Sequence, residues 1–533
     1  MDMFKVMIRD NMSPIAKERL EAIDSIEVVV DNNKETNSPE ALSAIIKDFH
    51  AIAIRSGTRI TDQVLANAPH LKVIGRAGAG VDNIDVEAAT KRGIVVMNAP
   101  GGNTVTTAEH AISLMLSLAR NIPQGTASLR EGRWEKKTLT GIEITGKILG
   151  IVGLGQIGRV VAERAGGLKM RVIASDPFVG KSSAREMGVE LVTLDELFRL
   201  ADFITLHVPR LPETAGMINA ETIQKMKPGV RIINCSRGEV VDLDALHEAV
   251  QTGHVAGAAL DVFPKEPPDP SLPILKNPKI IFTPHLGAST GEAQDKVAIM
   301  IADQIADYLD KEIITNAVNF PSISKDILIH IAPHLSLSER MGSLMGQLVR
   351  TAIHDINITY SGEFTKLDTR LLTHAAIKGL LSSFTDRPVN QINALSLAKE
   401  KGITIKETMS QATENFTGLI KIKLEGCESA PDEVWGTIFG EKYPRIVRLG
   451  TISMDAIPEG YMAVIRNHDK PGVIGNLGTL LGKHNINIGR FQLGRREGQA
   501  LCMVNIDTPM NDGILNQIRL LPNIISATQV KLG

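Results

Sequence analysis

Residues 148–158 read ILGIVGLGQIG, an apolar run that passes directly into three spaced glycines. The run predicts a buried strand, and the glycines predict a turn into a helix that starts near Arg159. In this pattern Gly153 permits a tight turn, Gly155 lets the backbone approach a pyrophosphate, and Gly158 lets helix and strand touch. Glycine spacing alone is a weak signal, and a generic glycine turn is the alternative interpretation.

The residues after the glycines favour NAD as the ligand of this turn. Residues 173–176 read IASD, which places Asp176 at the end of the next predicted strand. A carboxylate there accepts hydrogen bonds from the ribose hydroxyls and repels the 2′-phosphate of NADP. Pro177 and Phe178 follow in place of an arginine. In this context the glycine motif predicts an NAD site.

Short apolar segments alternate with helical patterns on both sides of the glycine motif. Helices are expected at 13–24 and 39–49, and strands upstream of the motif at residues 6–8, 51–54, 73–74 and 95–97. Six further strands are expected at residues 148–152, 171–174, 203–206, 231–233, 255–260 and 280–282. The alternation predicts an α/β protein with parallel sheets, and the six strands suit a Rossmann-type doubly wound sheet.

Composition excludes several classes of protein. A chain of 533 residues, 43% of them hydrophobic, has material for three or four domains. The formal net charge of −2 argues against nucleic acid as the main partner, and no apolar run approaches the length of a membrane span. Cys235, Cys427 and Cys502 are too few and too widely spaced for a disulfide framework, which fits a reducing compartment. Without a signal peptide, we expect a cytoplasmic protein, and no metal site is predicted.

Three charged residues follow successive predicted strands beside the nucleotide motif: Arg237, Glu266 and His285. His285 titrates near neutrality and is the candidate general base. Glu266 can hold its other ring nitrogen and raise its pKa, while Arg237 offers a planar cation to a substrate carboxylate or carbonyl. Singly they could be a strand cap, a solvated acid and a surface ion pair. Together, at strand ends beside a nucleotide motif, they predict hydride transfer involving a 2-hydroxy acid.

Four segments carry a resemblance to the D-isomer-specific 2-hydroxyacid dehydrogenase family: GLGQIG (153–158), CSRGE (235–239), ALDVFPKEP (259–267) and TPHLGAST (283–290). The resemblance covers about the first three hundred residues and implies the catalytic roles just given. It also implies that an NAD domain (101–287) is inserted into a flavodoxin-like substrate domain (1–100 and 288–318), with a returning helix near 291–309. Beyond the glycines, the cofactor contacts that it implies are Gln156, Ile157, Asp176, Val208, Cys235, Ser236, Arg237, Asp261, His285, Gly287, Ala288 and Ala79.

Two glycine-rich turns end strands of the first domain and suit an anionic substrate group. Their candidate binding residues are Arg55, Ser56, Gly57, Arg76, Gly78 and Gly80. Backbone N–H groups in such turns, with arginine nearby, bind carboxylate or phosphate, although a plain glycine turn is the alternative. Asn103, before a long predicted helix, is either an N-cap or a hinge residue that faces the substrate. The basic segment 130–137 either reaches a substrate phosphate, in its own subunit or across a subunit boundary, or is a solvated loop.

Three upstream segments resemble the branch of this family that acts on D-3-phosphoglycerate: RSGT (55–58), RAGAGVDN (76–83) and GGNTVTTAEH (101–110). This resemblance implies oxidation to 3-phosphohydroxypyruvate with NAD, the first step of L-serine biosynthesis. Two alternatives stay open, a dehydrogenase of another D-2-hydroxy acid and an NAD-sensing corepressor or scaffold. The complete set of Arg237, Glu266 and His285 argues against the scaffold.

The rest of the chain predicts two regulatory domains. Residues 319–455 resemble the α+β intervening domain of long members of the phosphoglycerate branch, with a helix expected at 336–351 and strands at 356–360 and 419–424. Residues 459–533 have the β-α-β-β-α-β order of a ferredoxin-like fold and resemble an ACT domain. That resemblance implies a homo-oligomer, a dimer or tetramer, in which paired subunits bind serine through Asn467, Asp469 and Asn487. A purely dimerising domain is the alternative.

Overall fold

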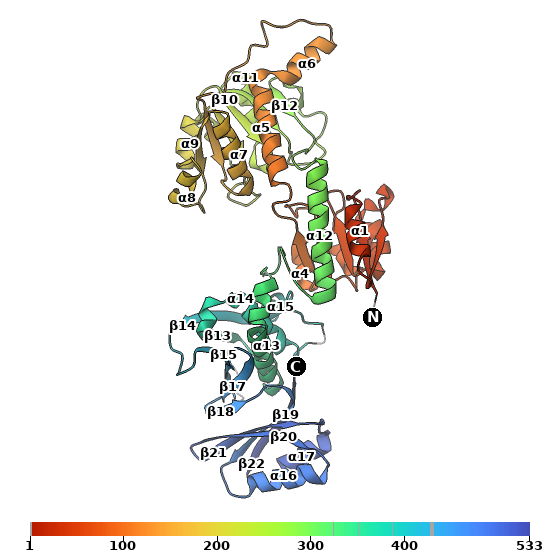
Figure 1. Ribbon diagram of the computed structural model, residues 1–533, viewed down its shortest axis with the longest axis vertical. Coiled ribbons are helices and arrows are strands. Elements are labelled where there is room, and N and C mark those ends of the chain that lie inside the picture. The colour runs from red at the N-terminus through yellow and green to blue at the C-terminus, as the bar shows by residue number, and fades with distance from the viewer. Residues whose placement is uncertain (1–2, 323–324, 350, 386, 427–430) are drawn as a thin grey trace.

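The computed structural model describes residues 3–322, 325–349, 351–385, 387–426 and 431–533. Four β-sheets follow one another along the long axis of the molecule, with the sheet of the glycine motif at one end and the C-terminal sheet at the other (Figure 1). No helix in the described ranges has the combined length and apolar character needed to cross a membrane. Cys235 and Cys502 are free and buried, whereas Cys427 lies outside the described residues.

The first sheet is parallel, with the strand order β2-β1-β3-β4-β5. Its strands are β1 (Phe4–Ile8), β2 (Ile26–Val30), β3 (Ala51–Ile54), β4 (Val73–Arg76) and β5 (Val95–Asn98). The expectation of four strands was wrong by one, because β2 is an edge strand with a single buried residue and Glu27 interrupts its apolar run. The two helices predicted at 13–24 and 39–49 are shorter in the structure. Helix α1 (Ile15–Glu21) starts after Pro14, and α2 (Pro39–Ile45) is followed by a 3-10 turn.

The second sheet is also parallel and has the order β12-β11-β10-β9-β6-β7-β8. The six predicted strands are β6 (Ile148–Val152), β7 (Arg171–Ser175), β9 (Phe203–Leu206), β10 (Val230–Asn234), β11 (Val255–Leu260) and β12 (Ile280–Phe282). The two-residue strand β8 (Glu190–Leu191) was too short to be predicted. Helix α7 (Gln156–Gly167) begins three residues earlier than expected, because the chain becomes helical directly after Gly155, with Gly158 already inside the helix.

Two long helices join these sheets. Helix α5 (Thr104–Arg120) leads from the first sheet to the second, and α12 (Gly291–Lys311) returns to pack on the first (Figure 1). At Gly75 on β4 an added Cβ atom would lie 2.6 Å from the side chain of Ile301, so glycine permits the close approach of α12. The predicted returning helix is therefore present.

The third sheet is mixed, with the order β14-β13-β15-β16-β17-β18. Its strands are β13 (Asp355–Gly362), β14 (Thr404–Ser410), β15 (Gly418–Glu425), β16 (Glu433–Phe439), β17 (Tyr443–Leu449) and β18 (Ile452–Ala456). Helices α13 (Lys325–Leu348) and α14 (Thr369–Leu381) pack together beside it. The expected helix bounds of 336–351 were wrong, because α13 starts eleven residues earlier and accommodates Pro333.

The fourth sheet is antiparallel, with the order β20-β21-β19-β22. Its elements are β19 (Gly460–His468), α16 (Val473–Lys483), β20 (Ile488–Arg496), β21 (Gln499–Ile506), α17 (Asp512–Arg519) and β22 (Ile524–Leu532). The predicted β-α-β-β-α-β order is confirmed. Apolar residues of this sheet, among them Met462 and Leu501, share one buried cluster with the third sheet.

Candidate active site

The glycine loop between β6 and α7 is shaped by close backbone contacts. Gly153 has φ +91°, and an added Cβ atom would lie 2.5 Å from the carbonyl oxygen of His207. A Cβ atom on Gly158 would lie 2.2 Å from the carbonyl oxygen of Gly153. At Gly155, by contrast, no atom lies within 4 Å of that position. Gly153 and Gly158 therefore permit the close backbone contacts of the turn, whereas Gly155 faces open space at the N-terminus of helix α7.

Asp176, directly after β7, ties this loop to the second strand of the motif. Its Oδ2 accepts a hydrogen bond from the backbone N–H of Leu154 at 2.8 Å, and its Oδ1 accepts one from Phe178 at 2.8 Å. Gln156, at the start of α7, accepts from the hydroxyl of Thr104 at 3.2 Å. The glycine loop, the second strand end and the first turn of α5 are thus fixed to one another.

His285 and Glu266 form a hydrogen-bonded pair at the carboxyl end of the second sheet. Nδ1 of His285 donates to Oε2 of Glu266 at 2.7 Å, and Oε1 of Glu266 accepts from the Phe263 amide at 3.1 Å. The bond to Glu266 raises the pKa of His285 above its ordinary value, although burial opposes this. Burial disfavours the charged form of Glu266, but the bonds from His285 and Phe263 outweigh it, so its pKa is lowered. The pair is suited to holding and releasing one proton on the imidazole.

Arg237, after β10 of the second sheet, reaches the turn that follows β4 of the first sheet. Its Nε donates to Oδ2 of Asp82 at 3.0 Å, and Nη1 donates to the carbonyl oxygen of Ser236 at 2.9 Å. An added Cβ atom on Gly80 would lie 2.2 Å from Nη2 of Arg237, so a side chain there would displace the guanidinium from this position. Asp82 was not predicted, although it lies within the quoted RAGAGVDN segment.

Further arginines from the first sheet gather beside Arg237. Burial, followed by the neighbouring cation Arg237, lowers the pKa of Arg76 to about 10. Arg55 adds to this repulsion, while Asp82 and Asp10 oppose it. Nε of Arg76 is buried and has no hydrogen-bond partner among the described residues. Such a crowded cationic cluster is suited to an anionic ligand that would relieve the repulsion.

Asp10, at the end of β1, holds the first glycine-rich turn and was also missed. Its Oδ2 accepts from the backbone N–H of Arg55 at 2.7 Å and of Thr58 at 3.0 Å, and its Oδ1 accepts from the Thr58 hydroxyl at 2.7 Å. A Cβ atom on Gly57 would lie 2.9 Å from Oδ1 of Asp10. A carboxylate two residues after a strand with a buried end was the signal that could have identified it.

Four further predicted binding residues, Asn103 and the three effector candidates, lie at a helix start and in the C-terminal domain. Asn103 occupies the N-cap position of α5 but its side chain makes no capping bond. In the C-terminal sheet, Asp469 pairs with Arg495 at 2.7 Å and Asn487 donates to Asp507 at 2.8 Å. Asn467 is buried, and its side chain donates to the carbonyl oxygen of His468 at 2.8 Å. The three effector candidates are thus already hydrogen-bonded within the chain.

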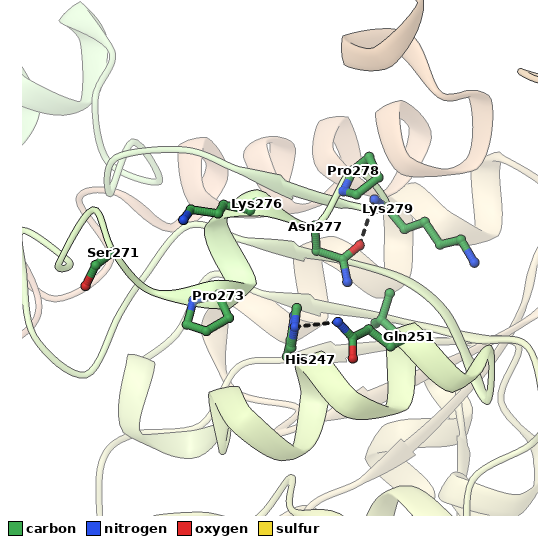
Figure 2. A pocket seen from close by; sticks show the side chains of 9 residues that line it. His247, Gln251, Ser271, Pro273, Lys276, Asn277, Pro278 and Lys279 are labelled. Atoms are coloured by element: carbon green, nitrogen blue, oxygen red, sulfur yellow. Dashed lines mark hydrogen bonds between the residues drawn. The ribbon is translucent and has the colours of Figure 1, made fainter.

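Two hollows lie on the second sheet. One, of about 410 Å³, is mostly apolar and adjoins the catalytic pair, with Phe263, Pro268 and Phe282 in its wall. The other, of about 440 Å³, lies along α11 (Leu243–Thr252) and contains none of the predicted site residues (Figure 2). We therefore place the candidate active site at the first hollow, which His285 and Glu266 line.

Comparison with known proteins identifies the family. Residues 112–287 match the NAD binding domain of D-isomer specific 2-hydroxyacid dehydrogenases, residues 330–450 the D-3-phosphoglycerate dehydrogenase intervening domain, and residues 461–522 the ACT domain. The D-3-phosphoglycerate dehydrogenase of Archaeoglobus fulgidus is 42% identical over 99% of this chain and 100% of its own length. The chain belongs to the D-3-phosphoglycerate dehydrogenase family. A further relative of that name, from Bacillus subtilis, is 39% identical over 99% of this chain and 100% of its own length.

Solved structures of this dehydrogenase fold match the first part of the chain. D-lactate dehydrogenase from Aquifex aeolicus, complexed with NAD and lactic acid, is 28% identical with a TM-score of 0.52, covering 60% of this chain and 100% of that one. A glyoxylate reductase from Paecilomyes thermophila is 30% identical with a TM-score of 0.54, covering 60% and 99%. The matched NAD binding domain and these similar structures show that the chain is an NAD-dependent 2-hydroxyacid dehydrogenase.

Proposed function

We propose that the chain oxidises D-3-phosphoglycerate to 3-phosphohydroxypyruvate with NAD as the hydride acceptor, the first step of L-serine biosynthesis. The observation that carries the proposal is the cluster of Arg55, Arg76 and Arg237 next to the His285–Glu266 pair. The substrate carries a carboxylate at one end and a phosphate at the other, so it can neutralise several cations at once. Full-length relatives that carry the name D-3-phosphoglycerate dehydrogenase support the choice of substrate.

In this proposal the reaction is divided among three side chains. Nε2 of His285 accepts the proton of the C2 hydroxyl, and Glu266 stabilises the imidazolium that forms. Arg237 binds the carboxylate and polarises the oxygen that becomes a carbonyl. When bound, NAD supplies the acceptor for the hydride that leaves C2. Arg55 and Arg76, with the amides of Ser56, Gly57, Gly78 and Gly80 and the side chain of Asn103, hold the anionic groups.

The glycine loop fits NAD. Gly155 leaves open space before the N-terminus of α7, where a pyrophosphate gains from the helix dipole. Asp176 uses one hydrogen bond per oxygen within the chain, which leaves lone pairs for the ribose hydroxyls. We assign the remaining cofactor contacts to Gly153, Gln156, Ile157, Gly158, Val208, Cys235, Ser236, Asp261, Gly287, Ala288 and Ala79.

We also propose the domain limits and the assembly. Residues 1–100 and 288–318 form the substrate domain, 101–287 the NAD domain, 319–455 the intervening domain and 459–533 the ACT domain. The ACT match supports an amino-acid effector, for which we propose serine bound by Asn467, Asp469 and Asn487 in a cytoplasmic homo-oligomer, a dimer or tetramer.

The test is NAD reduction with D-3-phosphoglycerate, D-glycerate and D-lactate at equal concentrations. We expect the highest kcat/KM with D-3-phosphoglycerate, because only that substrate engages the arginine cluster at both ends.

His285→Ala should lower kcat by about 100- to 10,000-fold while NADH still binds. His484→Ala, which changes an exposed histidine at the C-terminal end of helix α16, is the matched control. Faster turnover of an unphosphorylated substrate would contradict the proposal.

A further inference from the structure

The carboxylate of Asp261, directly after β11, is buried and surrounded by donors. Oδ1 accepts hydrogen bonds from the Thr283 hydroxyl at 2.6 Å and the Leu286 amide at 2.7 Å, and Oδ2 accepts one from the Gly287 amide at 2.8 Å. The carbonyl oxygen of Asp261 accepts from the His285 amide at 2.9 Å. One residue therefore holds the chain on both sides of His285.

This support matters because His285 has an unfavourable backbone conformation. Its φ is +53°, in the left-handed region that residues other than glycine seldom adopt. Such a conformation persists where the surrounding structure fixes it. The hydrogen bonds that Asp261 accepts from Thr283, Leu286 and Gly287 supply that constraint. They thereby fix the direction in which the imidazole side chain of His285 points.

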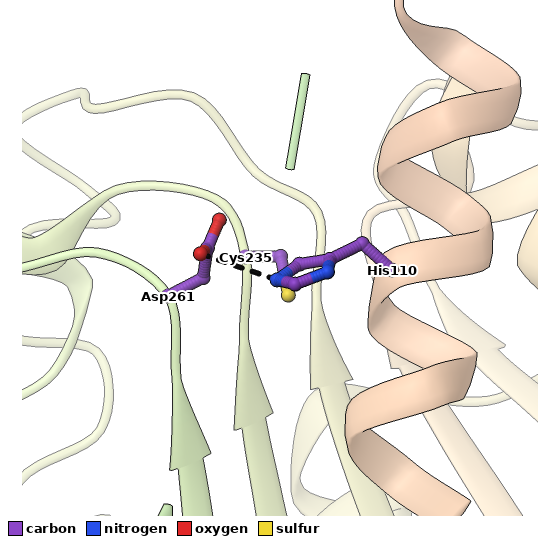
Figure 3. A group of neighbouring side chains, drawn as sticks. All are labelled: His110, Cys235 and Asp261. Carbon is purple, nitrogen blue, oxygen red and sulfur yellow. Dashed lines mark ion pairs between the residues drawn. The ribbon is translucent and has the colours of Figure 1, made fainter. Parts of the chain in front are cut away.

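The side chain of His110 extends from helix α5 toward the carboxylate of Asp261 (Figure 3). Its Nε2 lies 3.2 Å from Oδ1 of Asp261 and 3.1 Å from the hydroxyl oxygen of Thr283. Thr283 already donates its proton to Asp261, and the carboxylate has none to give, because the bonds from His110 and Thr283 outweigh burial and lower its pKa. Nε2 of His110 must therefore carry the hydrogen and donate it.

A metal site is the other interpretation of this cluster, because ligand atoms of His110, Cys235 and Asp261 lie within 4.8 Å of one another. The carboxylate, however, is already bonded to four donors of the chain. Burial also raises the pKa of the Cys235 thiol well above its ordinary value, which disfavours the thiolate that a metal requires. The cluster is therefore better described as a hydrogen-bonding network.

Neighbouring residues on the same face of α5 support this description. Thr107, three positions before His110, donates its hydroxyl hydrogen to the Gly287 carbonyl oxygen at 2.9 Å. Thr106, four positions before, lies 3.3 Å from the hydroxyl of Thr290. Residues three and four apart share a helix face. Helix α5, which connects the two sheets, thus holds the segment 283–290 at three points.

We propose that His110 is a positioning residue: from α5 it fixes Asp261 and Thr283, and through them the backbone that directs His285 at the substrate. The inference rests on the proposed function, because it concerns the same proton transfer. It adds a residue that does not touch the reacting atoms.

The test compares His110→Leu with His110→Gln in the full-length protein. Leucine removes the donor, whereas the glutamine amide can place an N–H near the position of Nε2. We expect His110→Leu to lower kcat by about 10- to 100-fold, the range for loss of one hydrogen bond to a charged group, and His110→Gln to recover most of it. Glu109→Gln, an exposed neighbour on α5, is the control.

A second readout does not depend on the substrate. The groups that set the titration of His285 are Glu266, Asp261 and Arg237. If His285 shifts in His110→Leu, its contact with Glu266 weakens, so NMR should report a lower imidazole pKa, restored in His110→Gln. Unchanged kcat and titration in His110→Leu would overturn the inference, as would equal defects in both variants. Failure of the wild-type protein to oxidise D-3-phosphoglycerate would instead refute the proposed function, and the NMR comparison would still decide the role of His110.

Discussion

Glu266 and His285 change each other's pKa, and this coupling makes their pairing testable by pH. The hydrogen bond from Nδ1 to the carboxylate raises the pKa of His285, while burial opposes it. Oxidation requires the neutral imidazole as base, so the rate should rise as the pH rises through that pKa. The pH at the midpoint of this rise therefore reports the strength of the pair.

Glu266→Gln should move the rising limb of the kcat/KM profile to lower pH. The neutral amide no longer stabilises the imidazolium, so His285 loses its proton at a lower pH than in the unmodified enzyme. We also expect kcat to fall by about tenfold, because the ring is held less firmly. The measurement is a full pH–rate profile for both proteins. A limb that stays in place would show that the two residues are not coupled in the working enzyme.

Asp176→Ala should narrow the preference for NAD over NADP. The change removes an acceptor for the ribose hydroxyls and a negative charge that repels the 2′-phosphate. It also frees the amides of Leu154 and Phe178, so we expect the KM for NAD to rise about tenfold, the cost of one strong hydrogen bond. Kinetics with both cofactors measure the change, and Glu190→Gln, at an exposed ion pair of the same sheet, is the control. Equal use of both cofactors by the unmodified enzyme would contradict the assignment.

The sequence pointed to three candidate catalytic residues through their place after predicted strands, but not to the residues that the structure places in contact with them. His285, Glu266 and Arg237 each follow a buried strand, so an apolar run locates them. Asp82 contacts Arg237 across 155 positions of sequence, and a contact of that kind depends on how two sheets face each other. His110 was hidden for the same reason, because its partner Asp261 lies on another element.

At the scale of elements, burial decided which segments were predictable. The strands β6, β9 and β10 are largely or wholly buried and were located to within a residue at either end. The edge strand β2 and the two-residue strand β8 were missed. In β2, Glu27 shortens the apolar run to residues 28–30, none of which is buried, and β8 has no apolar run. Helix α13 was placed too late in the chain, since its first turns precede the proline that normally ends or starts a helix.

The contact between α13 and α14 depends on glycine and gives a test of packing. An added Cβ atom on Gly379 would lie 2.0 Å from the carbonyl oxygen of Glu339, and backbone cannot move aside cheaply. Gly379→Ala should therefore lower stability by about 1–3 kcal/mol. Gly482→Ala is the matched control, because no atom lies within 4 Å of its added Cβ and alanine favours the helix by about 1 kcal/mol. Calorimetry should show a lower transition temperature for the first variant only. An unchanged temperature would mean that the two helices separate readily.

At the scale of the whole molecule, the part of the chain that carries the third sheet is packed on the first sheet. Ile331, Leu371 and Ile392 of the intervening segment belong to the same buried cluster as α12 and the first sheet. The Asn390 side chain also donates to the Gly93 carbonyl oxygen at 2.7 Å. The third and fourth sheets in turn share a cluster that contains Val434. A contiguous packed route thus runs from the C-terminal sheet to the sheet that carries Arg55 and Arg76 (Figure 1).

This route predicts how an effector at the C-terminal sheet would act. Serine bound there cannot touch His285, so it can slow catalysis only by favouring an arrangement of the domains with lower activity, a coupling of about 1–3 kcal/mol or roughly 5- to 150-fold.

Asp469 is already paired with Arg495, so the ammonium group of serine must compete with that guanidinium for the carboxylate. We therefore expect Asp469→Ala and Asn487→Ala to abolish inhibition with little change in uninhibited turnover, and Arg495→Ala to lower the serine concentration that inhibits. Serine titrations of all four proteins under identical substrate conditions measure this, with Asp512→Asn, on the helix α17, as control. If millimolar serine leaves the unmodified enzyme unaffected, the C-terminal domain serves assembly or senses another ligand.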